Sequence, residues 1–316
     1  MRKENERLLE KYKVKYPVAI LLFNRVENTK KLFNIVKKVE PEKLFLIADG
    51  PRKENKEDSI KCKETRKIFD NIDWNCKVYK KFSDKNLGCA KNGYTGFSWV
   101  FENVEEAIFL EDDCIPDISF FKFCDELLEK YRNDSRIMLI SGTNQLGNWK
   151  KTDYSYHFSR FGGIWGWASW RRAWKYYDFD MRLWNDKEVR KNLRKQLNFF
   201  QYISRRDIYN QIYNKTAKFS SWAYQWGFAR IVQSGLAISP CVNLITNIGS
   251  GNDATNNKKK SSVSNLKSFE MKFPLKHPQF VLPDVEYDKK IYNKIQGSNY
   301  RILKNYLSYR VKRVLK

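Results

Sequence analysis

Three consecutive carboxylates, Glu111, Asp112 and Asp113, follow an apolar run, AIFL, in this 316-residue chain. Like charges at this spacing raise one another's pKa and oppose ionisation. A divalent cation removes that penalty, and hard oxygen ligands suit Mn²⁺ or Mg²⁺ rather than zinc. Such a cation can bridge a diphosphate and stabilise the charge on a leaving nucleoside diphosphate. The triplet therefore predicts a metal and nucleotide site; the alternative is a solvated acidic group that caps the next helix.

Two other apolar runs end in polar residues that could share this site. Asn24 and Arg25 follow PVAILLF, and the sequence DGPR, from Asp49 to Arg52, ends the run LFLIA. Asp49 could accept hydrogen bonds from a base or ribose, and the two arginines could meet a base or phosphates. The alternative for DGP is a simple turn, because Asp, Gly and Pro are turn formers.

A glycine-containing segment, KNLGCAKNG, begins at Lys85 and leads into an expected helix. A helix N-terminus with a nearby lysine suits a phosphate group. A plain connection between a strand and a helix explains the same residues equally well.

Tryptophans are concentrated in the segment RFGGIWGWASWRRAW. Trp165 and Trp167 are flanked by glycines, which allow close approach of the backbone to a ligand, so we expect them to line a sugar-binding surface. Trp170 and Trp174 are spaced i, i+4, and we expect them to pack in the core.

The elements that must position these residues alternate between strand and helix in the first half. Continuous apolar runs of strand length predict buried strands, and Asn28 is the expected cap of the first helix. This order predicts an α/β fold with a mostly parallel sheet and helices on both faces. Ligands of such sheets bind at the carboxyl ends of the strands. The expected strands are 17–23, 44–49, 74–82, 107–113, 136–142 and 236–249, and the expected helices include 56–69, 90–101, 120–134, two within 187–213, and 220–235.

The composition bounds the partners and the compartment. The formal charge of +24 favours anionic partners, although a coding bias toward lysine is an equal explanation. Six scattered cysteines without C-x-x-C spacing fit a reduced cytoplasmic protein. The charged N-terminus has no signal-peptide core, and the longest apolar stretch is too short to span a bilayer.

The order NR, ADGP, NLG, EDD and GIWGWASWRRAW resembles GT-A fold glycosyltransferases, and among them bacterial proteins related to N-acetylglucosaminyltransferase I. The resemblance covers about residues 16–255. It implies a Rossmann-like sheet and Asp113 as the direct ligand of Mn²⁺. It also implies that Glu111 and Asp112 contact the ribose or donor sugar, and that Arg25 and Asp49 contact the base. These relatives use UDP-sugars and invert the anomeric centre, with a general base that deprotonates the acceptor hydroxyl.

The sequence departs from the family's pattern at the expected general base. Animal relatives have an aspartate between two tryptophans, whereas here the stretch Trp222–Trp226 reads WAYQW. Either the base lies elsewhere, or the alignment fails here, or the chain is inactive with Ala223 in place of the base. We favour Asp253 as the base, with Asp178 and Asp180 as other candidates.

Four segments follow from this interpretation. Residues 1–142 form the nucleotide-sugar-binding α/β half, 143–255 the aromatic-rich acceptor-side half of the same domain, 256–298 a polar loop and extension, and 299–316 a basic tail. Leu303, Leu307, Val311 and Val314 fall on one helical face of the tail. That pattern suits peripheral contact with an anionic membrane, at the inner face of the cell membrane; a helix packed on the domain is the alternative.

The sequence thus predicts an inverting, metal-dependent glycosyltransferase. Its partners would be a UDP-sugar donor, such as UDP-GlcNAc, and a surface-glycan acceptor, free or lipid-linked. The alternatives are a catalytically inactive relative that binds glycans or nucleotides, and a basic nucleic-acid-binding protein. No helix-turn-helix, zinc-finger or RNP-like pattern supports specific nucleic-acid binding. A nucleotidyltransferase would need a glycine-rich loop after the first strand, where FNRVENTKK has no glycine.

Overall fold

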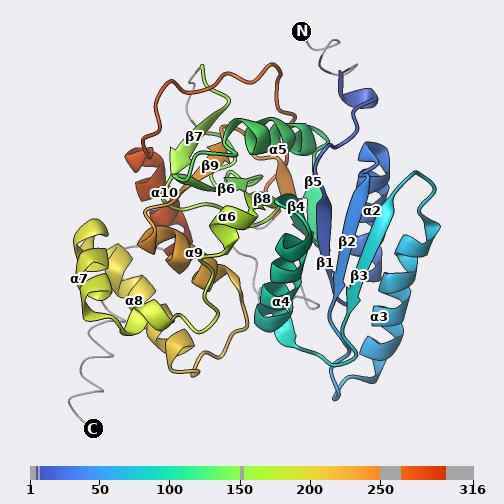
Figure 1. The fold of residues 1–316 in the computed structure, drawn as a ribbon, viewed down its shortest axis with the longest axis horizontal. Helices are drawn as coiled ribbons and strands as arrows, with labels where there is room; N and C mark the ends of the chain where they lie inside the picture. Colours follow the sequence, from blue (N-terminus) through green and yellow to red (C-terminus); the bar gives the residue numbers. More distant parts are fainter. Residues whose placement is uncertain (1–4, 6–7, 150–152, 250–264, 297–316) are drawn as a thin grey trace.

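An eight-stranded sheet forms the centre of the fold in this computed structural model, which describes residues 5, 8–149, 153–249 and 265–296 (Figure 1). The strands lie in the order β3-β2-β1-β4-β8-β6-β9-β7. Their bounds are β1 (Val18–Leu22), β2 (Lys43–Ala48), β3 (Lys77–Phe82), β4 (Glu106–Glu111), β6 (Ile137–Ser141), β7 (Tyr156–Ser159), β8 (Trp167–Trp170) and β9 (Leu236–Pro240).

The expected mostly parallel sheet is confirmed. β1 is parallel to β2 and β4, β2 is parallel to β3, and β6 is parallel to β9. β8 lies antiparallel between β4 and β6, and β7 is the antiparallel edge strand beside β9. A separate two-stranded ribbon pairs β5 (Cys114–Pro116) with β10 (Ile245–Asn247). The sheet therefore joins strands from both halves of the chain.

Helices cover both faces of the sheet, as the apolar runs predict. Alternate residues of β1 point to opposite faces: Ile20 packs with α2 (Val26–Val39) and α5 (Ser119–Lys130), whereas Ala19 belongs to the cluster of α4 (Gly88–Asn103) and α9 (Ala223–Val232). The remaining helical elements are α3 (Lys56–Lys67), η1 (Ile68–Asn71), α6 (Arg171–Trp174), η2 (Arg182–Asn185), α7 (Lys187–Gln196), α8 (Phe199–Tyr213) and α10 (Val285–Gln296).

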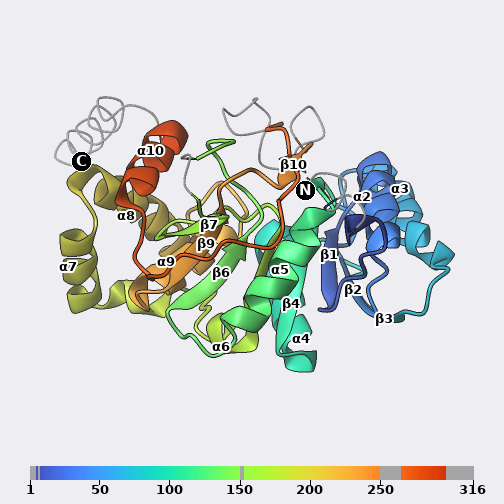
Figure 2. The ribbon, with the colours of Figure 1, turned by 90° about the horizontal axis from the view of Figure 1, so that it is seen from above.

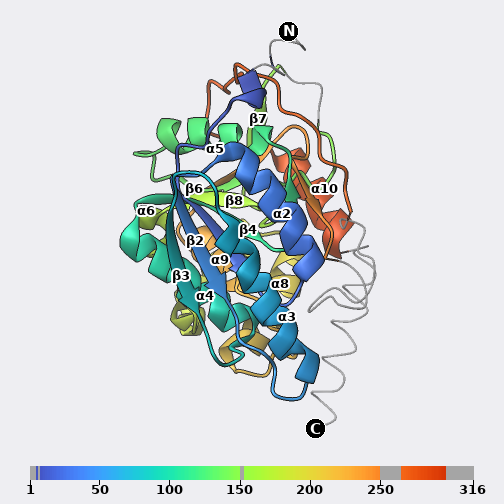
Figure 3. The same ribbon diagram turned by 90° about the vertical axis from the view of Figure 1, so that its right-hand side faces the viewer.

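The two ends of the molecule are built differently. α2 and α3 lie side by side near β2 and β3 at one end (Figure 3). At the other end α7 and α8 pack with α9 and η2 around a third apolar cluster, which includes Trp184, Tyr209 and Phe228 (Figure 2). The two helices expected within 187–213 are thereby confirmed.

The first helix begins earlier than expected. α2 starts at Val26 with Arg25 at the N-cap position, so Asn28 lies within its first turn and the expected cap was wrong. The Arg25 carbonyl accepts the Thr29 N–H at 2.9 Å, which starts the helical hydrogen bonding directly after β1. No side chain caps this helix: the guanidinium of Arg25 has only donors, and it pairs with acidic residues at the end of β4.

Across the part of the chain that the structure describes, no helix is long and apolar enough to cross a membrane. All six cysteines are free thiols. Asp253 and the tail 299–316 lie outside the described residues, so the expectations for them remain predictions.

Gly96→Ala should destabilise the fold, because a Cβ at this position of α4 would clash with Cγ2 of Ile47 on β2. Overpacking costs about 1–3 kcal/mol, and the gain in helix propensity of about 1 kcal/mol offsets part of it. We expect a net loss of about 1–2 kcal/mol in the free energy of unfolding, measured by urea denaturation. Gly227→Ala is the matched control: nothing lies within 4 Å of its Cβ, so it should stabilise α9 by about 0.5–1 kcal/mol. Equal effects of the two substitutions would contradict this packing.

Candidate functional site

A pocket of about 240 Å³ opens at the carboxyl ends of β1, β2 and β4. The chain runs outward from β1 through β2 to β3 and then crosses to β4 on the other side of β1. Ligands of α/β sheets bind at such a switch in strand order. Seven residues that the sequence singled out line this pocket: Arg25, Asp49, Arg52, Glu111, Asp112, Asp113 and Trp165.

Arg25 bridges two of the three acids. Its Nη1 lies 2.7 Å from Asp112 Oδ1 and 2.9 Å from Asp113 Oδ2. The backbone N–H of Phe23 donates to the second oxygen of Asp112 at 3.0 Å. Burial raises the pKa of Asp112, and the charge of Arg25 opposes that rise. The guanidinium is thus the present counter-charge of the acidic cluster.

Glu111 points elsewhere, toward a tryptophan of α9. The indole Nε1 of Trp222 donates to Glu111 Oε1 at 3.3 Å. Burial first, and then the charges of Asp113 and Asp112, raise the pKa of Glu111 to about 8. This carboxyl is therefore mostly protonated near neutral pH in the absence of a further cation. In the sequence, Trp222 stands out only beside the missing base, and no local pattern indicates its contact with Glu111.

Asp113 is enclosed by the segment that follows β10. Asn247 Nδ2 donates to Asp113 Oδ1 at 3.0 Å, and the Ile248 N–H donates to the Asp113 carbonyl at 2.9 Å. A Cβ at Gly249 would clash with Asp113 Oδ2, so only glycine at this position allows the carboxylate to stay where it is. The sequence reading missed Asn247 and Gly249, since they lie more than 130 residues from Asp113.

No group of three His, Cys, Asp or Glu side chains within the described residues is arranged to hold a metal ion. The geometry gives the reason: Asp112 and Asp113 share Arg25, while Glu111 is turned toward Trp222. A cation would therefore meet one or two carboxylates here rather than a complete protein cage.

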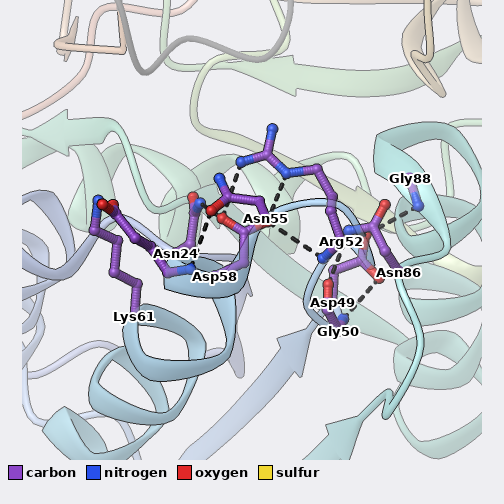
Figure 4. A network of polar contacts seen from close by, with 10 residues as sticks. Asn24, Asp49, Gly50, Arg52, Asn55, Asp58, Lys61, Asn86 and Gly88 are labelled. Carbon is purple, nitrogen blue, oxygen red and sulfur yellow. Dashed lines mark hydrogen bonds and ion pairs between the residues drawn. The ribbon is translucent and has the colours of Figure 1, made fainter.

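Asp49 holds the loop in front of α4. Its carboxylate accepts hydrogen bonds from the N–H groups of Gly50, Leu87 and Gly88, at 2.7–3.0 Å, and from the Asn86 side chain at 3.2 Å (Figure 4). Burial raises the pKa of Asp49, and these backbone hydrogen bonds counter it. Gly50 is required for close approach, since a Cβ there would lie 2.5 Å from the backbone of Lys85. The expected contact of Asp49 with a base remains a prediction.

A second network ties Arg52 and Asn24 to a buried acid of α3 that the sequence reading did not single out. Arg52 Nε and Nη2 lie 2.5 and 2.9 Å from the carboxylate of Asp58, and Asn24 Nδ2 donates to it at 2.7 Å (Figure 4). Arg52 lines the pocket, whereas Asn24 does not. Asn24 therefore holds the loops beside the pocket through Asp58, and its expected role as a nucleotide-sugar ligand remains a prediction.

Two further expected site residues, Lys85 and Trp167, lie outside the lining of this pocket. Lys85 is exposed and does not line the pocket; its neighbours Asn86 and Gly88 do. Trp167 is 1% exposed and stacks on Phe109 at 4.3 Å between ring centroids, so it belongs to the core on the central strand β8. Trp165 lines the pocket, as a sugar-facing residue would. Trp170 and Trp174 are buried, as expected.

Arg25→Met should expose the mutual repulsion of the acids. Breaking a buried ion pair costs about 3–5 kcal/mol, and we expect a loss of that size in the free energy of unfolding. Mn²⁺ should restore part of it, because the freed carboxylates can then bind the cation. Thermal unfolding with Mn²⁺ and with EDTA measures both effects. Arg182→Met, whose side chain is 83% exposed, is the control; a rescue by Mn²⁺ that is equal in the two variants would contradict the assignment.

Asp58→Asn should lower the free energy of unfolding by about 1–2 kcal/mol at pH 7, the contribution of a charged hydrogen bond. This value is discounted for solvent screening, because the Arg52 side chain is 46% exposed. Hydrogen bonding to Arg52 lowers the pKa of Asp58, so the wild type has this stabilisation above pH about 4 and loses it as the pH falls further. The difference between the two proteins should therefore shrink in acid. Glu57→Gln, on the exposed face of α3, should have little effect. A difference that stays constant down to pH 2–3 would contradict the role of the Asp58 charge.

Comparisons with known proteins find only distant structural similarity, with low TM-scores. No protein-family model matches the chain, and no curated protein sequence matches it. Among solved structures, mannosyltransferase PcManGT from Pyrobaculum calidifontis, in complex with GDP-Man and Mn²⁺, has 8% identity and a TM-score of 0.35, covering 73% of this chain and 79% of that one. HddC from Yersinia pseudotuberculosis has 15% identity and a TM-score of 0.30, covering 50% and 78%. The 4-diphosphocytidyl-2C-methyl-D-erythritol synthase from Anaerococcus prevotii has 12% identity and a TM-score of 0.32, covering 64% and 82%. Scores this low leave the pocket itself as the basis for a function.

Proposed function

We propose that this chain is a metal-dependent, inverting glycosyltransferase of the GT-A type. It would move a sugar from a UDP-sugar, such as UDP-GlcNAc, to a hydroxyl of a surface-glycan acceptor, free or lipid-linked. The observation that carries the proposal is the convergence of Glu111, Asp112, Asp113 and Arg25 in one pocket at the switch in strand order. We propose a cytoplasmic location, with the basic tail in contact with the membrane.

The charge balance of the pocket supports a metal-bound diphosphate. Four acidic side chains line it, those of Asp49, Glu111, Asp112 and Asp113, against the two guanidinium groups of Arg25 and Arg52. A bound cation would favour the ionised form of Glu111, which is mostly protonated without one. Arg52 is moreover paired with Asp58 outside the pocket lining. A divalent cation would supply the missing positive charge, and the two arginines could then pair with phosphate oxygens.

The residues present fit Mn²⁺ or Mg²⁺ held by few protein ligands. Mg²⁺ in nucleotide enzymes is commonly bound by one or two carboxylates together with substrate phosphates. Asp113 would be the direct ligand. Asn247 would hold it in position through the hydrogen bond to Asp113 Oδ1. When bound, the cation would stabilise the charge on the departing nucleoside diphosphate. Glu111 and Asp112 would contact the ribose or donor sugar.

The acceptor side would use Trp165, whose ring can cover the apolar face of a sugar. Inversion needs a base to take the proton from the acceptor hydroxyl. Asp253 is our candidate for that role. Asp178 and Asp180 suit it less well, because they pair with Arg182 and Lys215 and do not line the pocket.

Thermal unfolding with UDP-sugars, with and without Mn²⁺, tests the donor site. A ligand at 100 times its Kd stabilises by about 2.7 kcal/mol, and we expect stabilisation only when nucleotide and metal are both present. Asp113→Asn should abolish this joint effect, whereas Glu57→Gln should retain it. If Asp113→Asn kept the full stabilisation, the metal assignment would be wrong.

Release of UDP in the presence of acceptor glycans tests turnover. UDP-sugar binding without UDP release would support the inactive relative suggested by Ala223. Salt-dependent binding of RNA or DNA without any UDP-sugar binding would instead support the nucleic-acid alternative.

A further inference from the structure

A buried arginine of α9 lacks the partners that such a group requires. Arg230 is 3% exposed, and its Nε and Nη1 are buried with no hydrogen-bond partner in the described residues. Burial lowers the pKa of Arg230 to about 10. An unpaired buried charge costs several kcal/mol, so a purely structural arginine would be expected to find acceptors.

Arg172 shows what a structural arginine looks like in this fold. Its guanidinium donates to three backbone carbonyls, those of Arg132 at 2.6 Å, Ile137 at 2.9 Å and Tyr131 at 2.7 Å. The contrast with Arg230 lies in these acceptors.

Two more arginines lie near Arg230 and are more exposed. The charges of Arg205 and of Asp288 both act on Arg230, and the Arg160 N–H donates to that same Asp288. Arg205 on α8 is half-buried, lies 4.3 Å from the centre of the Phe161 ring, and has a buried Nη1 without a partner among the described residues. Arg160, after β7, is exposed. The acid of the region, Asp288, already accepts hydrogen bonds from Ser159 Oγ at 2.5 Å and from the Arg160 N–H at 3.2 Å. The three arginines named here therefore outnumber Asp288, the acid whose charge acts on Arg230.

This basic cluster (Arg160, Arg205 and Arg230) is connected to the pocket in two ways. Trp222, Trp226 and Arg230 are spaced i, i+4, i+8 on one face of α9, so Arg230 lies about 12 Å along the helix from the pocket residue Trp222. The loop that starts at Phe161 against Arg205 reaches the pocket at Ile164 and Trp165.

We propose that Arg205 and Arg230 form a subsite for an oxyanion, a phosphate or carboxylate, carried by the acceptor. Guanidinium groups suit such anions because their planar donors match two oxygens at once. The anion would supply the acceptors that Arg230 lacks, and the excess charge would attract it from the surface past Arg160. The acceptor role rests on the proposed glycosyltransferase function; binding of the anion does not.

Thermal unfolding in inorganic phosphate, at ionic strength matched with NaCl, tests the subsite directly. The wild type should be stabilised by phosphate beyond the NaCl control. Arg230→Met should raise the melting temperature without phosphate, because it removes an unpaired buried charge, and should lose at least half of the phosphate shift. Arg205→Met, at a half-buried position with less risk to folding, should lose it similarly.

Arg172→Met is the matched control: it should lower the melting temperature, because it leaves three carbonyls unpaired, yet retain the phosphate shift. No phosphate shift in the wild type, or a shift that both Arg230→Met and Arg205→Met keep in full, would overturn the subsite.

The acceptor role has its own readout. Joint stabilisation by UDP-sugar and Mn²⁺ should be unchanged in Arg230→Met. The substitution should raise the KM for acceptor glycans that bear phosphate or carboxylate at least tenfold more than it raises the KM for neutral acceptors. An equal change for charged and neutral acceptors would overturn the acceptor role. Absence of donor binding in the wild type would overturn the proposed function, and the phosphate shift would still decide the subsite.

Discussion

The guanidinium of Arg25 lies between Asp112 and Asp113 where β1 and β4 end. This positive charge offsets the repulsion between the two neighbouring carboxylates. The same contact joins two neighbouring strands at their carboxyl ends and directs the start of α2, because Arg25 is also the residue from which that helix begins. Arg25 thus compensates the charge of the acids and also links the ends of two strands, and the geometry of the pocket depends on both contacts.

The acids around the pocket divide into those that organise loops and those that remain available. Asp49 and Asp58 are saturated by hydrogen bonds from the loops and helices around them. Their carboxylates stabilise the walls of the pocket, because they supply acceptors for backbone N–H groups that would otherwise be unpaired. Glu111, with one long contact from Trp222, and Asp113, held by Arg25 and Asn247, face the space where a donor would lie.

Arginines show the same division. Arg172 is enclosed by carbonyl acceptors and Arg52 by Asp58, whereas Arg230 retains buried donors without acceptors. Stability alone would favour replacing such a group by an apolar side chain. Its retention in a well-packed helix is the kind of local cost that proteins accept at binding sites.

Local patterns in the sequence predicted the parallel strands of the first half, the helices on both faces and the acidic triplet at a strand end. These features follow from local periodicity and from the position of charges after apolar runs. Local patterns did not indicate β7 or the central strand β8, and the expected strand 236–249 is divided between β9 and β10. The tertiary structure decided which residues share the pocket: Trp165 lines it while Trp167 is in the core, and Asn24 turns to Asp58. It also brought Asn247 to Asp113 and Trp222 to Glu111, across more than 100 residues. No local pattern encodes such contacts, because they arise only when strands and helices distant in sequence pack together.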